Sequence, residues 1–494
     1  MNFSVSLVAP LELQTPCLVL PVWSEDALPA AATAYDEKLG GLLAEIVASD
    51  GFSAGVGETR VVYASGENAP RLVLLGLGKR DNFSLDRFRK ALVKAARAVR
   101  AIKKSSFALA LPSVDTAGLE PLVQSAAEAI ELGLMQFNDF KRGEHFEIEA
   151  VTLLLDASAD ADAAQTAIER AGVLCRANAR ARALVNQPSN IKTPASIAAA
   201  AVEVATETGL RIEVWDEQKI QDEKMGALWG VGMGSDHPPR FIVMEYMPPG
   251  TENDAPVALV GKGMSFDTGG YSIKTSGGME EMKDDMAGAA VVIAAMSALK
   301  DLNVKKRVLG VVASAENMIS GNAQRPGDIV TARDGTTIEV LNTDAEGRLI
   351  LADALTWTSE QKPELIVDFA TLTGAIGVAL GQEGAGLFSN DDGLSRNLEE
   401  AGLETGEKLW RFPLWEEYDD YMKGSASDLK NISAADRRAG SIAAAIFLRH
   451  FVPKNTPWAH LDIAAVSHVR DSRLLTERGA TGFGVRLILD FLST

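Results

Sequence analysis

The central part of the chain reads Val257-Ala258-Leu259-Val260-Gly261-Lys262-Gly263-Met264-Ser265-Phe266-Asp267-Thr268-Gly269-Gly270. Val257 to Val260 is a short, fully apolar run, which is typical of a strand buried on both faces. The run ends in glycines, and Lys262 and Asp267 lie just past its carboxyl edge. Open α/β sheets bind ligands at that edge, and glycines let the backbone approach a bound group closely. The stretch therefore predicts an α/β fold with a ligand site at the end of this strand.

Similar apolar runs extend this pattern over the second half of the chain, where strand and helix candidates alternate. The predicted strands are Phe241 to Tyr246, Val257 to Val260, Arg307 to Val312 and Leu365 to Phe369, and the predicted helices are Met279 to Leu299 and Gly347 to Trp357. Near-continuous apolar strands separated by helices indicate a sheet that is covered on both faces.

The first 150 or so residues have a similar α/β texture. The predicted strands are Cys17 to Val22, Arg71 to Leu77, Phe107 to Leu111 and Val151 to Leu155, and a basic amphipathic helix is predicted over Asp86 to Lys103. The small, acidic segment Asp156 to Asp162 marks a boundary, and a long helix from about Ala163 to Val185 stops at Asn186-Gln187-Pro188. We therefore expect an N-terminal α/β domain over residues 1–160, a connecting helix over 161–187 and a second domain over 188–494.

Composition narrows the function classes. The 494 residues include 48 Lys+Arg and 67 Asp+Glu, a formal charge of −19, and this argues against a broad nucleic-acid interface, which needs clustered basic residues. The two cysteines are too few for a disulfide scaffold and fit a reducing compartment. The start of the chain has no basic n-region, and no apolar run reaches the roughly 18 residues that span a bilayer. We expect a cytoplasmic protein that has no membrane association.

Histidine is scarce, with five in the chain, and no two stand at H-x-x-x-H spacing. A helical two-histidine zinc site is therefore excluded. The sequence also contains no G-x-S-x-G nucleophile elbow. If the chain is an enzyme, its chemistry rests on carboxylates and amines.

A second dense segment, Leu341 to Leu349, carries Asp344, Glu346 and Arg348 just before a predicted helix. When this pattern is considered alone, helix capping by Asp344 and Glu346 is the favoured explanation. Together with Asp267 and Asp285, however, these carboxylates could converge only if cations offset their repulsion, which is about 4 kcal/mol for a like-charge pair at about 4 Å and a dielectric constant of about 20. Two divalent ions would do so and would create a hydrolytic two-metal site.

Several motifs resemble the leucyl aminopeptidase (cytosol aminopeptidase) family. The segment Asn342-Thr343-Asp344-Ala345-Glu346-Gly347-Arg348-Leu349 matches the family's signature octapeptide. The blocks that also resemble the family, in the expected order, are 186–190, 260–274, 282–288, 325–328, 370–375 and 458–464. The resemblance covers the chain from about residue 180 to the end, and the N-terminal third is similar only in its general α/β texture.

This resemblance implies a metal-dependent aminopeptidase with two divalent ions, Mn²⁺ or Zn²⁺, with Mg²⁺ as a further candidate. The implied metal ligands are Lys262, Asp267, Asp285, Asp344 and Glu346, with Asp267 and Glu346 bridging the ions. The resemblance further implies that Lys274 stabilises the oxyanion and that Arg348 holds a bicarbonate ion as general base. The residues that would line the pocket for the first side chain of the substrate are Met282, Asn342, Thr371 and Gly374.

The implied architecture is a smaller, variable N-terminal α/β domain and a larger α/β/α sandwich with a mixed, largely parallel sheet. The implied substrates are peptides with a free N-terminus, and the implied assembly is a homohexamer.

One departure from the family is Met286-Ala287-Gly288, where the family usually has a Gly-Gly pair after the methionine. Two alternatives stay open: a DNA-binding or architectural role, as in some bacterial relatives, through the basic segment Arg87 to Lys104, and a two-metal phosphoesterase.

Overall fold

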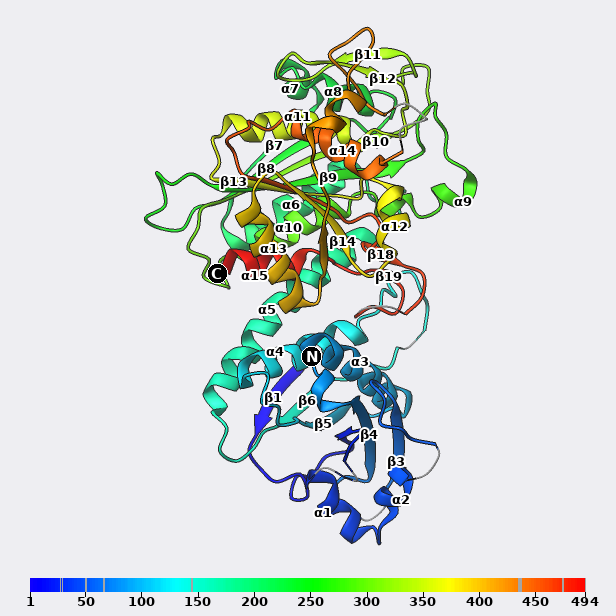
Figure 1. The fold of residues 1–494 in the computed structure, drawn as a ribbon, viewed down its shortest axis with the longest axis vertical. Coiled ribbons are helices and arrows are strands. Elements are labelled where there is room, and N and C mark those ends of the chain that lie inside the picture. Colours follow the sequence, from blue (N-terminus) through cyan, green and yellow to red (C-terminus); the bar gives the residue numbers. More distant parts are fainter. Residues whose placement is uncertain are drawn as a thin grey trace. The chain divides into compact units, whose positions relative to one another are not determined.

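The computed structural model describes residues 1–26, 28, 30–48, 51–64, 67–143, 145–433, 438–472 and 475–493. The chain forms two compact units (Figure 1). The first contains Met1–Arg176 and Asp471–Arg478, and the second contains Ala177–Arg470 and Gly479–Thr494. Within the described ranges, no helix combines the length and the apolar composition that a membrane span requires.

The first unit is built on a six-stranded sheet of order β1-β6-β5-β2-β4-β3. All neighbouring strands in it are parallel except β3, which pairs with β4 in the antiparallel sense. The strands are β1 (Asn2–Ser6), β2 (Leu18–Trp23), β3 (Thr59–Tyr63), β4 (Arg71–Gly78), β5 (Ser106–Ala110) and β6 (Ala150–Leu154), and the helices are α1 (Ala30–Lys38), α2 (Leu42–Ala48), η1 (Arg80–Asn82), α3 (Leu85–Ala101) and α4 (Leu119–Leu134).

Strand β2 shows why this sheet has a core on each face. Side chains alternate along a strand, so Val19 joins one hydrophobic cluster while Leu18 and Leu20 join the other. Helices α3 and α4 contribute to the first cluster, and α1 and α2 contribute to the second. The four strands and the helix predicted for this region agree with β2, β4, β5, β6 and α3, whereas β1, β3, α1, α2 and α4 were not identified from the sequence.

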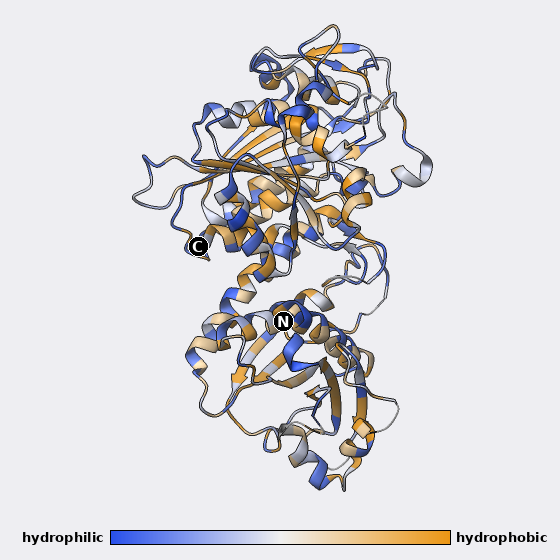
Figure 2. Cartoon of the chain, viewed as in Figure 1, coloured by the Kyte–Doolittle hydropathy of each residue, from blue (hydrophilic) through white to orange (hydrophobic). Residues whose placement is uncertain are grey.

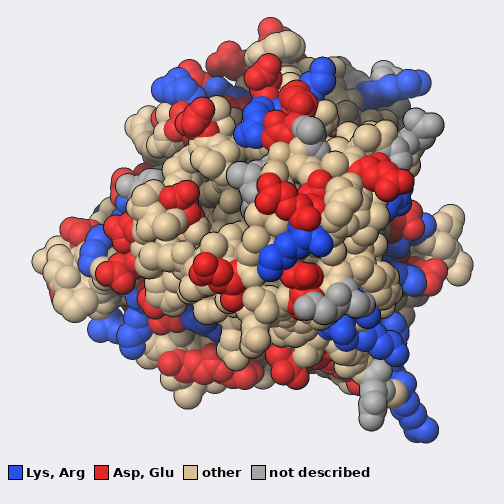
Figure 3. Space-filling view, turned by 90° about the horizontal axis from the view of Figure 1, so that it is seen from below, with Lys and Arg blue, Asp and Glu red and all other residues tan. Residues whose placement is uncertain are grey.

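Several basic residues of α3 have carboxylate partners. Lys90 pairs with Asp86 at 3.1 Å, and Arg89 lies 3.8 Å from Glu128. Arg97 and Arg100 both pair with Glu477. These partners offset part of the positive charge of the basic helix, and Figure 3 shows acidic and basic side chains interspersed on one face of the molecule. A DNA-binding role stays a prediction, and the ion pairs of α3 do not favour it.

The long helix predicted before the second domain is α5 (Ala161–Asn186). Polar side chains near its C-terminal end bind the backbone of a segment late in the chain. Asn178 donates to Gly482 O, Arg182 donates to Thr481 O, and Asn186 Oδ1 accepts from Ala480 N at 3.0 Å. This end of α5 is therefore fixed within the second unit.

The second unit contains an eight-stranded sheet of order β15-β14-β17-β13-β9-β10-β8-β7. The four central strands β17, β13, β9 and β10 are parallel, and β14, β8 and β7 introduce antiparallel pairs. The sheet is thus mixed and largely parallel, as predicted. Its strands are β7 (Arg211–Trp215), β8 (Arg240–Tyr246), β9 (Val257–Asp267), β10 (Val308–Asn317), β13 (Leu365–Ala370), β14 (Ala385–Ser389), β15 (Leu409–Arg411) and β17 (Trp458–Asp462).

Helices cover both faces of this sheet, which confirms the α/β/α sandwich (Figure 1). One face packs against α6 (Pro194–Thr208), α10 (Ala287–Ala298), α13 (Asp392–Thr405) and α15 (Val485–Ser493), and the other against α8 (Gly226–Gly232) and α11 (Gly347–Glu360), with α14 (Gly440–Arg449) on α11. Figure 2 shows the strands between these layers as predominantly hydrophobic. The remaining elements are α7 (Glu217–Asp222), α9 (Ser276–Met279), η2 (Met282–Asp284), β11 (Asp328–Thr331), β12 (Thr337–Val340), α12 (Gly374–Leu380), η3 (Glu416–Tyr421), β16 (Leu429–Lys430), β18 (His468–Val469) and β19 (Gly479–Ala480).

The predicted helix Met279 to Leu299 was wrong at its N-terminal end. The short helix α9 ends at Met279, the turn η2 follows, and the regular helix α10 begins only at Ala287. At Gly288 a Cβ would lie 2.0 Å from Phe369 O, so α10 contacts β13 through bare backbone. Ala287, which stands where the family usually has the first glycine of a pair, is the first residue of α10 and is 4% exposed.

Candidate metal centre

Three segments bring carboxylates and amines to the carboxyl end of the central strands. Strand β9 contributes Lys262 and Asp267, which lie within the strand and not past its end, because β9 continues beyond the predicted end at Val260. The turn η2 is followed directly by Asp285, and the loop between β12 and α11 carries Asp344 and Glu346. Parallel strands place their carboxyl ends at one edge, and this explains why segments distant in sequence meet here.

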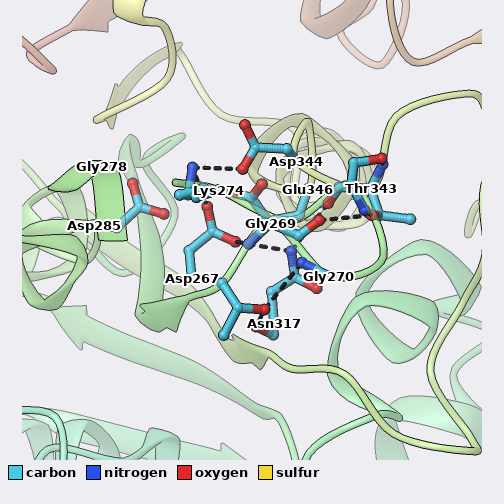
Figure 4. Close-up of polar contacts among 12 residues, drawn as sticks. Asp267, Gly269, Gly270, Lys274, Gly278, Asp285, Asn317, Thr343, Asp344 and Glu346 are labelled. Atoms are coloured by element: carbon cyan, nitrogen blue, oxygen red, sulfur yellow. Dashed lines mark hydrogen bonds and ion pairs between the residues drawn. The ribbon is translucent and has the colours of Figure 1, made fainter. Parts of the chain in front are cut away.

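The carboxylates of Asp267, Asp344 and Glu346 form the centre of the cluster. Each places one oxygen within 4.8 Å of the other two. Lys274 Nζ lies 2.8 Å from Asp267 Oδ2 and 2.5 Å from Asp344 Oδ1. Figure 4 shows the Lys274 ammonium between these two carboxylates, with Asp285 at one side of the group.

Lys262 is buried at the base of the cluster. Its Nζ donates to Asp285 Oδ1 at 2.7 Å and to Thr371 O at 2.8 Å, and it lies 3.1 Å from Glu346 Oε1. At Gly347, a Cβ would lie 2.5 Å from Lys262 Cε. The glycine of the signature octapeptide therefore provides the space that the lysine side chain occupies.

Asn317 supports Asp267 and was not identified from the sequence. Its Nδ2 donates to Asp267 Oδ1 at 2.8 Å and to Thr343 O at 3.0 Å. Asn317 is the last residue of β10 and pairs in register with Asp267, the last residue of β9. The predicted strand ended at Val312, whereas β10 continues through polar residues to Asn317. Asp267 was identified because ligands bind at the carboxyl ends of parallel strands. The same reasoning would have identified Asn317 if β10 had been predicted to its full length.

The surroundings raise the pKa of three carboxyl groups at the site, those of Asp267, Asp285 and Asp344. Burial is the largest cause for Asp267, Asp285 and Asp344, and neighbouring carboxylates add to the pKa rise while the two lysines oppose it. Burial by itself lowers the pKa of Lys262, but Asp285, Glu346 and Asp267 outweigh this effect and raise the pKa overall. In the absence of metal charge, the lysines therefore act as the counter-ions of the carboxylates.

The donor set fits divalent cations. Among the described residues, Asp285 Oδ2 and Glu346 Oε2 are buried and have no hydrogen-bond partner. A buried carboxylate oxygen without a partner is costly, and a cation would satisfy it. Oxygen-rich sites suit Mg²⁺ and Mn²⁺, and Zn²⁺ also binds carboxylates. The residues present can thus hold metal ions.

A cavity of about 650 Å³ opens beside the cluster. Of the eleven site residues predicted from the sequence, nine line it: Lys262, Asp267, Lys274, Met282, Asp285, Asp344, Glu346, Thr371 and Gly374. Glu281, His468 and Arg470 also line it and were not identified, and Arg470 Nε lies 3.0 Å from Glu281 Oε2. The structure thus brings most of the predicted site around one cavity.

Asn342 and Arg348 do not line this cavity. Asn342 Oδ1 accepts from Asp344 N at 2.9 Å, which shapes the loop that carries Asp344. Arg348 is 8% exposed and donates to Asn431 O at 2.8 Å, and among the described residues its Nε has no partner. Burial lowers the pKa of Arg348 to about 10, and Glu346 and Asp462 oppose that effect. The guanidinium therefore stays charged at neutral pH and has an unused donor.

Comparison with solved structures supports the fold. The bottromycin maturation enzyme BotP in complex with Mn is 32% identical, with a TM-score of 0.85, and the match covers 97% of this chain and 99% of that one. A tomato leucine aminopeptidase mutant is 34% identical, with a TM-score of 0.90, over 100% of this chain and 96% of that one.

Sequence comparison covers both units. A model of the cytosol aminopeptidase family catalytic domain matches residues 179–489. A model of that family's N-terminal domain matches residues 19–144, a region in which the sequence motifs had shown no specific resemblance. A probable cytosol aminopeptidase of a Geobacter species is 42% identical, over 100% of this chain and 99% of the relative. Another, from Syntrophotalea carbinolica, is 41% identical over the same shares. The chain therefore belongs to the cytosol aminopeptidase family and is a hydrolase of the aminopeptidase type.

Proposed function

We propose that this metal-dependent aminopeptidase removes leucine and other N-terminal residues from peptides with a two-metal site. The observation that carries the proposal is the buried cluster of carboxylates and lysines at one cavity, with carboxylate oxygens that have no partner among the described residues. The residues that would hold the ions are Lys262, Asp267, Asp285, Asp344 and Glu346, and the proposed ions are Mn²⁺ or Zn²⁺, with Mg²⁺ as a further candidate.

The bound ions would polarise the scissile carbonyl and make a water molecule more acidic. The chain's residues supply the remaining functions. Lys262 Nζ now donates to Asp285 Oδ1 and Thr371 O. It would have to release a proton to act as a ligand, because an ammonium nitrogen has no free lone pair. Asp267 is held by Asn317, so its carboxylate keeps a fixed orientation.

Lys274 would donate from Nζ to the substrate oxygen that gains negative charge. Its side chain is 18% exposed and lines the cavity, so a substrate can reach it. A fixed donor in a water-poor site stabilises developing charge more than water does. Arg348 would hold a bicarbonate ion, and that ion would supply the general base of the reaction. The unused Nε of Arg348 supports this role.

The first side chain of the substrate would contact Met282, Thr371 and Gly374, which line the cavity. Asn342 would contribute through the loop that it shapes.

We further propose that the protein acts in the cytoplasm, on the ground that the relatives are named cytosol aminopeptidases. A homohexameric assembly stays a prediction from the family resemblance, and light scattering of the purified protein tests it.

Metal removal and restoration test the proposed function. A chelator should abolish hydrolysis of leucine anilide, and Mn²⁺ should restore it. Asp344→Ala should lose metal binding and activity, whereas Asp254→Ala, an exposed aspartate of the same unit, should behave as the unsubstituted protein. Full activity of Asp344→Ala would contradict the assignment.

Two further assays separate the alternatives. Hydrolysis of simple phosphate esters in preference to aminoacyl anilides would favour the phosphoesterase. Retardation of DNA in a gel that weakens with salt would favour the DNA-binding role, because phosphate contacts depend on ionic strength. We expect neither.

A further inference from the structure

We propose that Lys192 is a positioning residue that fixes the turn η2, and through it the carboxylate of Asp285 and the side chain of Met282. This inference rests on the proposed function, because it assigns Lys192 a part in metal binding and substrate binding. Lys192 does not line the cavity, and its Nζ donates to two backbone carbonyl groups rather than facing the carboxylates.

Lys192 is the most completely buried lysine near the site, with 0% of its surface exposed. Its Nζ donates to Val185 O at 2.8 Å and to Lys283 O at 2.5 Å. Burial lowers the pKa of Lys192 to about 7, and Asp284 opposes this effect. An uncharged amine keeps two N–H groups, which match the two carbonyls, so this pair of hydrogen bonds does not depend on the charge of the lysine.

One acceptor belongs to the end of a long helix. Val185 lies in the last turn of α5, where backbone carbonyls have no partner within the helix. Lys283 Nζ also approaches this end, at 3.4 Å from Asn186 O. Since α5 is fixed by Asn178, Arg182 and Asn186, its C-terminal end is a firm anchor for Lys192.

The other acceptor belongs to the turn that carries the site residues. Lys283 is the middle residue of η2, with Met282 before it and Asp284 after it, and Asp285 follows directly. Asp285 Oδ1 accepts from Lys262 Nζ and from Thr371 Oγ1 at 2.8 Å. The backbone of Asp285 has a longer contact, from Met264 N to its carbonyl at 3.3 Å. The contact at Lys283 O therefore adds a short backbone restraint just before the proposed ligand.

A metal site depends on such a restraint because ligand distances tolerate only about 0.2 Å of error. Met282, in the same turn, lines the cavity beside Asp285. A shift of η2 would thus move a ligand and a wall of the substrate pocket together. Loss of Lys192 should therefore weaken both metal binding and substrate binding.

The test compares Lys192→Met and Lys192→Gln with Lys300→Met. Methionine keeps the length of the side chain without a donor, and glutamine restores N–H donors without a charge. Lys300 is a matched control, because it donates to Thr208 O at the end of α6, at 3.5 Å and away from the cavity. Mn²⁺ affinity is measured by calorimetry, together with KM and kcat on leucine anilide and the thermal midpoint.

We expect Lys192→Met to raise the Mn²⁺ dissociation constant by about 10- to 100-fold, with a higher KM, and Lys192→Gln to recover part of both. Lys300→Met should change neither. If Lys192→Met does not fold, Lys192→Gln is compared with the unsubstituted protein, and a weaker Mn²⁺ affinity supports the proposal. A folded Lys192 variant with unchanged Mn²⁺ affinity and KM overturns it, even if its thermal midpoint falls. Failure of the unsubstituted protein to bind Mn²⁺ would instead contradict the proposed function.

Discussion

Asn317 Nδ2 lies 2.8 Å from Asp267 Oδ1, and the two residues end neighbouring parallel strands in register. The same amide group donates to Thr343 O at 3.0 Å, in the loop that carries Asp344. Asn317 is 2% exposed and thus joins the β9 carboxylate to the β12–α11 loop inside the protein.

Asn317→Ala should therefore weaken metal binding. The orientation of Asp267 and the position of the loop would both relax, and groups that orient a metal ligand contribute about 10- to 100-fold in metal affinity or activity. Calorimetric titration with Mn²⁺ measures the effect. Asn322→Ala, an exposed loop asparagine, is the control, and equal affinities in the two variants would show that Asn317 has no such role.

Lys274→Met should lower kcat by about 100- to 1,000-fold, the effect of removing one donor to a developing oxyanion. KM should change much less, because the donor acts mainly on the charge that develops during reaction. Steady-state kinetics on leucine anilide with saturating Mn²⁺ measure both constants. Lys454→Met, at an exposed site, should behave as the unsubstituted enzyme, and a kcat of Lys274→Met within about threefold of that enzyme would contradict the oxyanion role.

Gly288→Ala should destabilise the second unit by at least about 1 to 3 kcal/mol. The added Cβ would lie 2.0 Å from Phe369 O and 2.9 Å from Lys262 N, so α10 would have to move away from β13 and β9. Gly277→Ala, where a Cβ meets nothing within 4 Å, should leave the stability nearly unchanged. Scanning calorimetry of the two variants provides the comparison, and equal midpoints would refute this account of the helix contact.

Asp353 should make stability depend on pH. Burial raises the pKa of Asp353 to about 7, although its carboxylate accepts from Leu228 N and Arg333 N, each at 2.8 Å. Between about pH 4 and about pH 7, the folded chain keeps a proton that the unfolded chain has lost, so the contribution of this group to stability falls as the pH rises. The loss is on the order of a few kcal/mol.

The Asp353→Asn variant lacks this titration. Its thermal midpoint should therefore decrease less than that of the unsubstituted protein between about pH 5 and about pH 8. Calorimetry over that range compares the two slopes, which removes the constant effect of the substitution on stability. Parallel slopes would show that Asp353 titrates at an ordinary pKa.

The sequence by itself identified strands β2, β4, β5 and β6 of the first unit and β8, β9, β10 and β13 of the second, and it marked the acidic residues that the family resemblance brings together. Apolar runs such as Val257 to Val260 identify buried strands because burial on both faces excludes polar side chains. Lys262, Asp267, Asp344 and Glu346 could be singled out because they follow such an apolar run or form a dense acidic segment before a helix.

The tertiary structure alone decided the restraints on that site. Asn317, Lys192 and Gly288 act through contacts with residues 50, 91 and 81 positions away, and such contacts leave no local periodicity in the sequence. The start of α10 at Ala287 was also set by distant contacts, because backbone packing on β13 and the hydrogen bonds of Asp285 override the helix propensity of the preceding residues. The local sequence pattern thus specified the apolar strands and the acidic residues of the candidate site. Long-range packing specified the positions in which those acidic residues are held.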